Sequence, residues 1–142
     1  MKKQSYAGFF GSREWTDPAP IKAALESLPR HTIIITGDAD GVDALTFDLA
    51  SELGFVVLVA TANWNYLGNA AGPRRNIPIA DISDYGFAFG FLDEADPDPN
   101  NRKGKGTRNC LGYFKELGKD VVVHRIGRPV LPQRRYKRRL PI

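Results

Sequence analysis

The sequence predicts an α/β protein, a Rossmann-like three-layer sandwich built around a mainly parallel five-stranded sheet. Short apolar runs alternate along the chain with segments of helical periodicity, which is typical of βαβ units. The run Thr32–Thr36 is rich in β-branched residues and lacks internal polar alternation, which indicates a strand buried on both faces of a parallel sheet. The length of 142 residues is ordinary for one domain.

The expected elements follow one another with clear start and stop signals. Asp17-Pro18 is a good helix start after the first strand, and Gly54 and Gly118 end later helices. The expected strands are Tyr6–Phe10, Thr32–Thr36, Phe55–Val59, Tyr85–Phe91 and Val121–His124. The expected helices follow Pro18, span Val42–Leu53 and span Thr107–Leu117. We expect mostly loop between Ala60 and Asp81, with one short helix around Arg74–Ala80, and a polar loop over Asp93–Lys105.

Charge is unevenly distributed along the chain. Of 20 basic residues, seven lie between Arg125 and the C-terminus, where no acidic residue occurs, so residues 1–124 carry 13 basic against 16 acidic groups. We therefore expect a Rossmann domain over residues 1–126 and a basic, Pro/Arg-rich tail over 127–142 that is extended and solvated or packs on a neighbouring subunit. The single cysteine, Cys110, and the lack of an apolar leader or span favour a cytoplasmic protein without membrane contact.

Unusual residues follow the predicted strands, and parallel sheets bind ligands beyond the carboxyl ends of their strands. Gly11-Ser12-Arg13 offers a tight turn, a hydroxyl and a guanidinium, although such a turn is also common without function. The turn Gly37–Asp43 combines two glycines at a helix N-terminus with three carboxylates, Asp38, Asp40 and Asp43. One of these three is expected to cap the helix, but capping does not need three.

Two later segments offer further anion and base contacts. In Trp64–Asn76 the aromatic rings of Trp64 and Tyr66 can stack on a base or cover the edge of the core, and Arg74 and Arg75 can hold phosphates. Gly104-Lys105-Gly106-Thr107 opens the last helix, which makes an anion site, but its order does not match a P-loop. His31 and His124 lack metal-ligand spacing, so we expect neither a metal nor a cofactor.

These motifs together resemble the SLOG superfamily, which includes DNA-processing protein A and the Lonely guy phosphoribohydrolases. The segments Gly37–Asp43 and Gly68–Asn76 are similar to its Gly-x-Ala-x-Gly-Val-Asp and Gly-x-Ala-Ala-Gly-Pro-x-Arg-Asn patterns, with Gly11–Arg13 and Gly106-Thr107 matching in the same order. The resemblance covers about Tyr6 to His124. It implies a nucleotide-binding fold in which Arg75 and Asn76 face the ligand, and it implies a homo-oligomer. The candidate ligand-binding residues are Gly11, Ser12, Arg13, Gly37, Asp38, Ala39, Asp40, Gly41, Asp43, Trp64, Gly72, Arg75, Asn76, Gly104, Lys105, Gly106 and Thr107.

One departure from the family pattern bears on chemistry. The phosphoribohydrolases carry a glutamate that assists glycosidic cleavage, and its position here is Cys110, which cannot supply a carboxylate. The candidate catalytic residues are then Asp40, Asp43 and Arg75. The departure favours binding over hydrolysis: a sensor or sequestering protein for an ADP-ribose-like or cyclic nucleotide, of the kind phages use against host immune signalling. Nucleotide hydrolysis and nucleic-acid binding through the basic tail are the alternatives.

Overall fold

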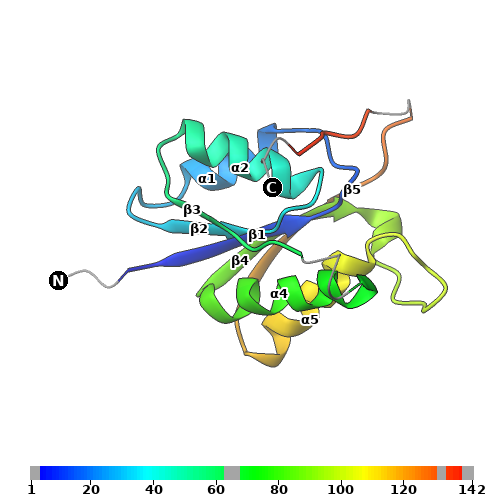
Figure 1. Cartoon of the computed structure of the whole chain (residues 1–142). Helices are drawn as coiled ribbons and strands as arrows, with labels where there is room; N and C mark the ends of the chain where they lie inside the picture. The colour runs from blue at the N-terminus through cyan, green and yellow to red at the C-terminus, as the bar shows by residue number, and fades with distance from the viewer. Residues whose placement is uncertain (1–3, 63–67, 131–133, 139–142) are drawn as a thin grey trace.

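Five parallel strands form one open sheet in the order β3-β2-β1-β4-β5 (Figure 1). The computed structural model describes residues 4–62, 68–130 and 134–138. The strands are β1 (Tyr6–Gly11), β2 (Ile33–Thr36), β3 (Val57–Val59), β4 (Tyr85–Phe91) and β5 (Val121–Ile126). The helices are α1 (Ala19–Glu26), α2 (Val42–Glu52), α4 (Ala71–Ile82) and α5 (Lys105–Glu116), with the short 3-10 helices η1 (Gly68–Ala70) and η2 (Leu92–Glu94). The predicted fold class is confirmed, and all the strand pairs are parallel.

The helices form two layers, one on each face of the sheet. The reason is that β2 and β3 are added on one side of the central strand β1, whereas β4 and β5 are added on its other side. Helices α1 and α2 cover one face and α4 and α5 cover the other (Figure 1). Phe9 of β1 packs in the core under α1 and α2, whereas its neighbour Phe10 packs under α4 and α5. This arrangement leaves the carboxyl ends of β1 and β4 side by side with their connections on opposite faces. Such a switch point is the usual ligand site of an open parallel sheet.

The segment before β4 differs from the sequence prediction. Instead of a short helix near Arg74–Ala80, α4 begins at Ala71 and contains Pro78. Its buried positions include Ala71, Arg75, Asn76 and Ile79, which share one helix face. Packing of that face against the sheet and α5 offsets the hydrogen bond lost at Pro78. The helix start at Asp17 is shifted as well, since Pro18 precedes the first residue of α1 and the Asp17 carboxylate accepts the Ala19 N–H.

The basic tail also differs from the expected solvated arrangement. Its described residues 134–138 lie against the start of α2, where the Tyr136 carbonyl accepts the Gly41 N–H at 2.9 Å. The Tyr136 ring packs against the core between the sheet and α1 and α2. Figure 1 shows this segment, coloured red, returning over the side of the molecule that carries those helices. The tail therefore contacts its own chain.

Gly11→Ala is expected to destabilise the fold by about 1–3 kcal/mol through overpacking. A Cβ on Gly11 would lie 2.0 Å from the Phe89 carbonyl oxygen and 2.8 Å from Val42 Cγ2, so β1 would have to move away from β4. Gly112→Ala is the matched control, because a Cβ there meets no atom within 4 Å and alanine favours the α5 helix by roughly 0.5–1 kcal/mol. Urea unfolding measures the free energy of unfolding of both variants. Equal changes in that free energy would contradict the close packing of Gly11 against Phe89 and Val42.

Candidate functional site

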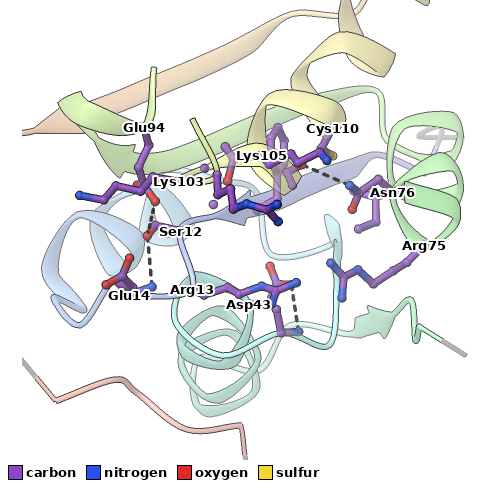
Figure 2. Close-up of a pocket in the computed structure, with 18 of the residues that line it drawn as sticks. Ser12, Arg13, Glu14, Asp43, Arg75, Asn76, Glu94, Lys103, Lys105 and Cys110 are labelled. Atoms are coloured by element: carbon purple, nitrogen blue, oxygen red, sulfur yellow. Dashed lines mark hydrogen bonds between the residues drawn. The ribbon is translucent and has the colours of Figure 1, made fainter. Parts of the chain in front are cut away.

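A cavity of about 370 Å³ opens at the switch point, beyond the carboxyl ends of β1 and β4 (Figure 2). Its walls come from the turn after β1, the start of α2, one face of α4, η2 and the N-terminus of α5. Its lining contains six cationic side chains against three carboxylates. The cations are Arg13, Arg75, Arg102, Lys103, Lys105 and Arg135, and the carboxylates are Glu14, Asp43 and Glu94.

Many of the predicted ligand-binding residues line this cavity together. They are Gly11, Ser12, Arg13, Ala39, Asp43, Arg75, Asn76, Gly104, Lys105, Gly106 and Thr107. Gly37, Asp38, Asp40, Gly41 and Gly72 do not line it, and Trp64, like Tyr66, lies outside the described residues. The residues that line the cavity and were not among the predictions are Phe10, Glu14, Ile79, Glu94, Arg102, Lys103, Cys110 and Arg135.

The turn between β2 and α2 directs its three carboxylates to three different partners. Asp43 faces the cavity, Asp38 forms a buried ion pair with Arg75, and Asp40 faces the tail. The prediction that one of them caps α2 is wrong, because Gly41 occupies the N-cap position without a side-chain cap. Gly41 has a φ of +74°, and a Cβ there would lie 2.2 Å from the Ser12 carbonyl oxygen. Glycine at position 41 therefore allows the turn between β2 and α2 to pack against the turn after β1.

The ion pair between Asp38 and Arg75 joins the α2 side of the cavity to α4. Arg75 Nη1 lies 2.7 Å from Asp38 Oδ1, with the two side chains 7% and 3% exposed. Asp38 Oδ2 accepts the Ala62 N–H at 2.9 Å, so the buried carboxylate is well satisfied. Figure 2 shows Arg75 reaching from α4 toward Asp43 at the cavity wall.

Asp43 is a buried acid with an unusual protonation state. Burial raises its pKa to about 6, and the charge of Arg75 and the hydrogen bond from the Ala39 N–H oppose this shift only in part. The Thr36 hydroxyl donates to the Phe9 carbonyl at 2.7 Å and lies 3.2 Å from Asp43 Oδ1. A hydroxyl has one proton, so a hydrogen bond at the second contact requires a proton on Asp43. Asp43 can thus donate or accept within the cavity near neutral pH.

Glu94 connects the two strands of the switch point and was not among the residues predicted from the sequence. Its Oε1 accepts the Phe91 N–H at 2.7 Å. Its Oε2 accepts the Ser12 hydroxyl at 2.9 Å, a bond drawn in Figure 2. The residue is only 5% exposed. Both carboxylate oxygens are therefore engaged in holding η2 against the turn after β1. The only sequence signal was its place three residues after a strand, within an acidic run typical of a solvated loop.

The N-terminus of α5 closes the cavity opposite Asp43. Gly104 caps the helix in the left-handed conformation, with φ +71°, and a Cβ there would lie 2.5 Å from Glu94 Cβ. The first turn contains no acidic residue and begins with Lys105, a charge that the helix dipole disfavours. Asn76 fixes α5 in place, because its amide donates to the Gly106 carbonyl at 3.2 Å and to Asn109 Oδ1 at 3.0 Å. The arrangement suits an anion.

Cys110 lies at the floor of the cavity with Phe10 and Ile79. It is 1% exposed, and burial raises the pKa of its thiol far above the ordinary value. The thiol therefore acts as a small apolar side chain and not as a nucleophile. Among the residues with described positions, no three His, Cys, Asp or Glu side chains gather so as to hold a metal ion. No helix in the described ranges is long and apolar enough to cross a bilayer.

Asp43→Asn is expected to remove a pH dependence from the free energy of unfolding. The folded protein keeps a proton on Asp43 up to about pH 6, whereas the ordinary pKa is 3.8, so between these values the folded state binds more protons. The contribution of Asp43 to stability then falls as pH rises, by about 3 kcal/mol in total. Urea unfolding at pH 4 and pH 7 should show the wild type losing roughly 2–2.5 kcal/mol more than the variant, because the unfolded-state carboxyl is already partly ionised at pH 4. Parallel pH profiles would contradict the buried, protonated state.

Comparisons with known proteins support the fold. Neither models of protein families nor curated protein sequences gave a match. Among solved structures, the X-ray structure of DNA processing protein A from Streptococcus pneumoniae is similar, with a TM-score of 0.66 and 17% sequence identity over 90% of this chain. The chain spans 52% of that protein's length. The chain therefore has the Rossmann-like fold of DNA processing protein A, which is the fold that its sequence motifs implied.

Proposed function

We propose that this protein binds a nucleotide or a nucleotide-derived small molecule in the switch-point cavity. The observation that carries the proposal is the cationic lining of that cavity at the open N-terminus of α5. The volume of about 370 Å³ lies in the usual range of small-molecule sites. Its apolar floor and charged rim suit a ligand with a flat apolar part and a phosphate.

The phosphate is assigned to the side of the cavity formed by α5 and the turn after β1. Backbone N–H groups in the first turn of α5 face an anion favourably, and Lys105 and Arg13 add charge from two sides. A Cβ on Gly106 would meet no atom within 4 Å, so the helix start is open to an approaching group. A lysine at the first helical position destabilises a free helix and stabilises one that holds an anion.

The sugar is assigned to Asp43 and Arg75 at the other side of the cavity. Ribose hydroxyls both donate and accept hydrogen bonds. A carboxyl with a pKa of about 6 and a fixed guanidinium together complement them. Burial strengthens these hydrogen bonds relative to water. Asp43 is therefore the residue that we expect to distinguish a nucleotide from an inorganic phosphate.

The role that we propose is binding without turnover, as a sensor or sequestering protein for an ADP-ribose-like or cyclic nucleotide. Of the three candidate catalytic residues, Asp40 is engaged with the tail and Arg75 with Asp38. Both carboxylate oxygens of Glu94 hold the walls of the cavity. We extend this proposal to a phage protein that acts against host immune signalling, and the support for that extension is the resemblance of the sequence motifs to the SLOG superfamily.

A homo-oligomer is part of the same proposal. Its support is the edge strand β5, where Val122 and Val123 are 62% and 44% exposed. Apolar side chains on an unpaired edge favour contact with another sheet or chain.

Hydrolysis of the nucleotide is the second candidate function, and Asp43 is the observation that favours it. A carboxyl whose pKa burial raises to about 6 is suited to general acid or base catalysis near neutral pH. Incubation with nucleoside monophosphates, NAD and ADP-ribose, followed by chromatography, separates the two functions. Recovery of intact ligand supports binding, and release of a free base or ribose phosphate supports hydrolysis.

Nucleic-acid binding through the tail is less well supported by the contacts. A DNA processing protein shares the fold, but several tail cations already have acidic partners in this chain. Arg128 pairs with Asp93 at 2.5 Å, and Arg138 pairs with Asp38 at 3.4 Å. Paired cations contribute less to neutralising a phosphate backbone.

Lys105→Gln is expected to weaken nucleotide binding about tenfold or more, because it removes a charge-assisted contact to phosphate. Lys115→Gln, at the other end of the same helix and outside the cavity, is the matched control and should bind as the wild type does. Isothermal titration calorimetry with AMP, ADP, ADP-ribose and cyclic AMP measures both. Absence of binding to every member of the panel by the wild type would contradict the proposed function. Equal losses in the two variants would contradict the assigned phosphate position.

A further inference from the structure

We propose that the basic tail completes the cavity with Arg135, and that this arginine binds a second phosphate of the ligand. The ligand class is then a nucleoside diphosphate or a nucleotide with a pyrophosphate linkage. The inference rests on the proposed nucleotide function and refines it. Among the described tail residues, Arg135 is the one that lines the cavity.

The tail is fixed at two places, which is why Arg135 has a defined position. Near its beginning, Arg128 pairs with Asp93 at 2.5 Å and with Glu14 at 3.3 Å, and its guanidinium lies 4.6 Å above the Phe91 ring. These contacts raise the pKa of Arg128 and lower the pKa of Asp93. The tail thus begins against η2 and the turn after β1, beside the cavity.

The second anchor surrounds Arg135 on its C-terminal side. Tyr136 accepts a backbone hydrogen bond from Gly41 at 2.9 Å, and its hydroxyl bonds to Asp48. The Arg138 N–H donates to Asp40 Oδ1 at 3.0 Å. Backbone hydrogen bonds of this kind fix the register of the segment, so the side chain at position 135 is directed to the cavity by its neighbours.

The same anchor is coupled to the cavity through Asp38. Arg138 Nη1 lies 3.4 Å from Asp38 Oδ2, and Arg75 holds the other oxygen of that carboxylate. The Arg138 side chain is only 16% exposed. One buried carboxylate therefore holds both a tail residue and a cavity residue, and the tail is part of the site's structure.

Arg135 itself is only loosely held. Its Nη1 lies 3.8 Å from Asp40 Oδ2, and its side chain is 45% exposed. Lys137 shares the same Asp40 oxygen at 3.9 Å. A long, half-exposed pair of this kind contributes little to stability, so the guanidinium has donors to offer to a ligand. Arginine binds phosphate with two parallel hydrogen bonds, which this exposed position permits.

The charge of the cavity favours more than one phosphate. With Arg135 included, six cationic side chains line the cavity against three carboxylates, which leaves an excess of three positive charges even when Asp43 is ionised at neutral pH. A single phosphate monoester carries a charge of about −1.5 to −2 at neutral pH, which leaves cationic side chains uncompensated. A second phosphate within reach of Arg135 compensates that excess. The tail is thus expected to determine specificity for the number of phosphates.

Arg135→Gln is expected to weaken ADP binding about tenfold while changing AMP binding less than twofold. Arg134→Gln, the adjacent and exposed tail arginine outside the cavity, should change neither affinity. Arg135→Lys should give an intermediate loss for ADP, since it keeps the charge but not the paired donors. Calorimetry with the full chain measures these affinities, and thermal unfolding verifies that each variant is folded.

Three results would overturn the inference while leaving nucleotide binding intact. They are wild-type affinity for ADP that does not exceed that for AMP, ADP affinity that Arg135→Gln leaves unchanged, and equal losses for AMP and ADP. Failure of the wild type to bind either nucleotide would instead reject the proposed function itself. Selective loss of ADP affinity in Arg135→Gln supports the assignment.

Discussion

The buried ion pair between Asp38 and Arg75 is the interaction on which the site depends. It joins the turn before α2, on one face of the sheet, to α4, on the other face, across the carboxyl ends of the strands. Burying two charges carries a large desolvation cost, which this pair offsets with a 2.7 Å contact and the additional Ala62 hydrogen bond. Loss of Asp38 would leave the buried Arg75 guanidinium in the wall of the cavity without its 2.7 Å partner.

The same turn explains how the chain accommodates its uneven charge. The acidic body and the basic tail are complementary, and two of the three aspartates in Gly37–Asp43 are counter-ions for tail residues. Asp43 faces the cavity, forms no ion pair with the described tail residues, and has a pKa that burial raises to about 6. Part of the positive charge that gives the sequence its high pI is thus paired within the molecule. The high pI is therefore weak evidence for a nucleic-acid partner.

The strands and most of the cavity-lining residues could be predicted because their signals are local. The β-branched, apolar composition of Thr32–Thr36 indicates a buried strand. The glycines of the turns indicate places where the backbone approaches another segment closely. The start of α4 could not be predicted in this way, because Arg75 and Asn76 occupy its buried face and Pro78 lies inside it. Glu94 was hidden in an acidic run, and its role arises only when β4 places it beside Ser12, 82 residues away. The position of Arg135 in the cavity lining depends on contacts between the tail and α2, and no local sequence pattern indicates those contacts.

The most direct test of this account is whether the tail is folded on its own domain in solution. Heteronuclear NOE values from ¹⁵N-labelled protein report the order of each backbone amide on the picosecond to nanosecond timescale. The account predicts that the amides of residues 134–138 are as ordered as those of α2, because the Tyr136 carbonyl accepts the Gly41 N–H and the Arg138 N–H donates to the Asp40 carboxylate. Values typical of a disordered chain end would contradict it, and with it the assignment of Arg135 to the cavity.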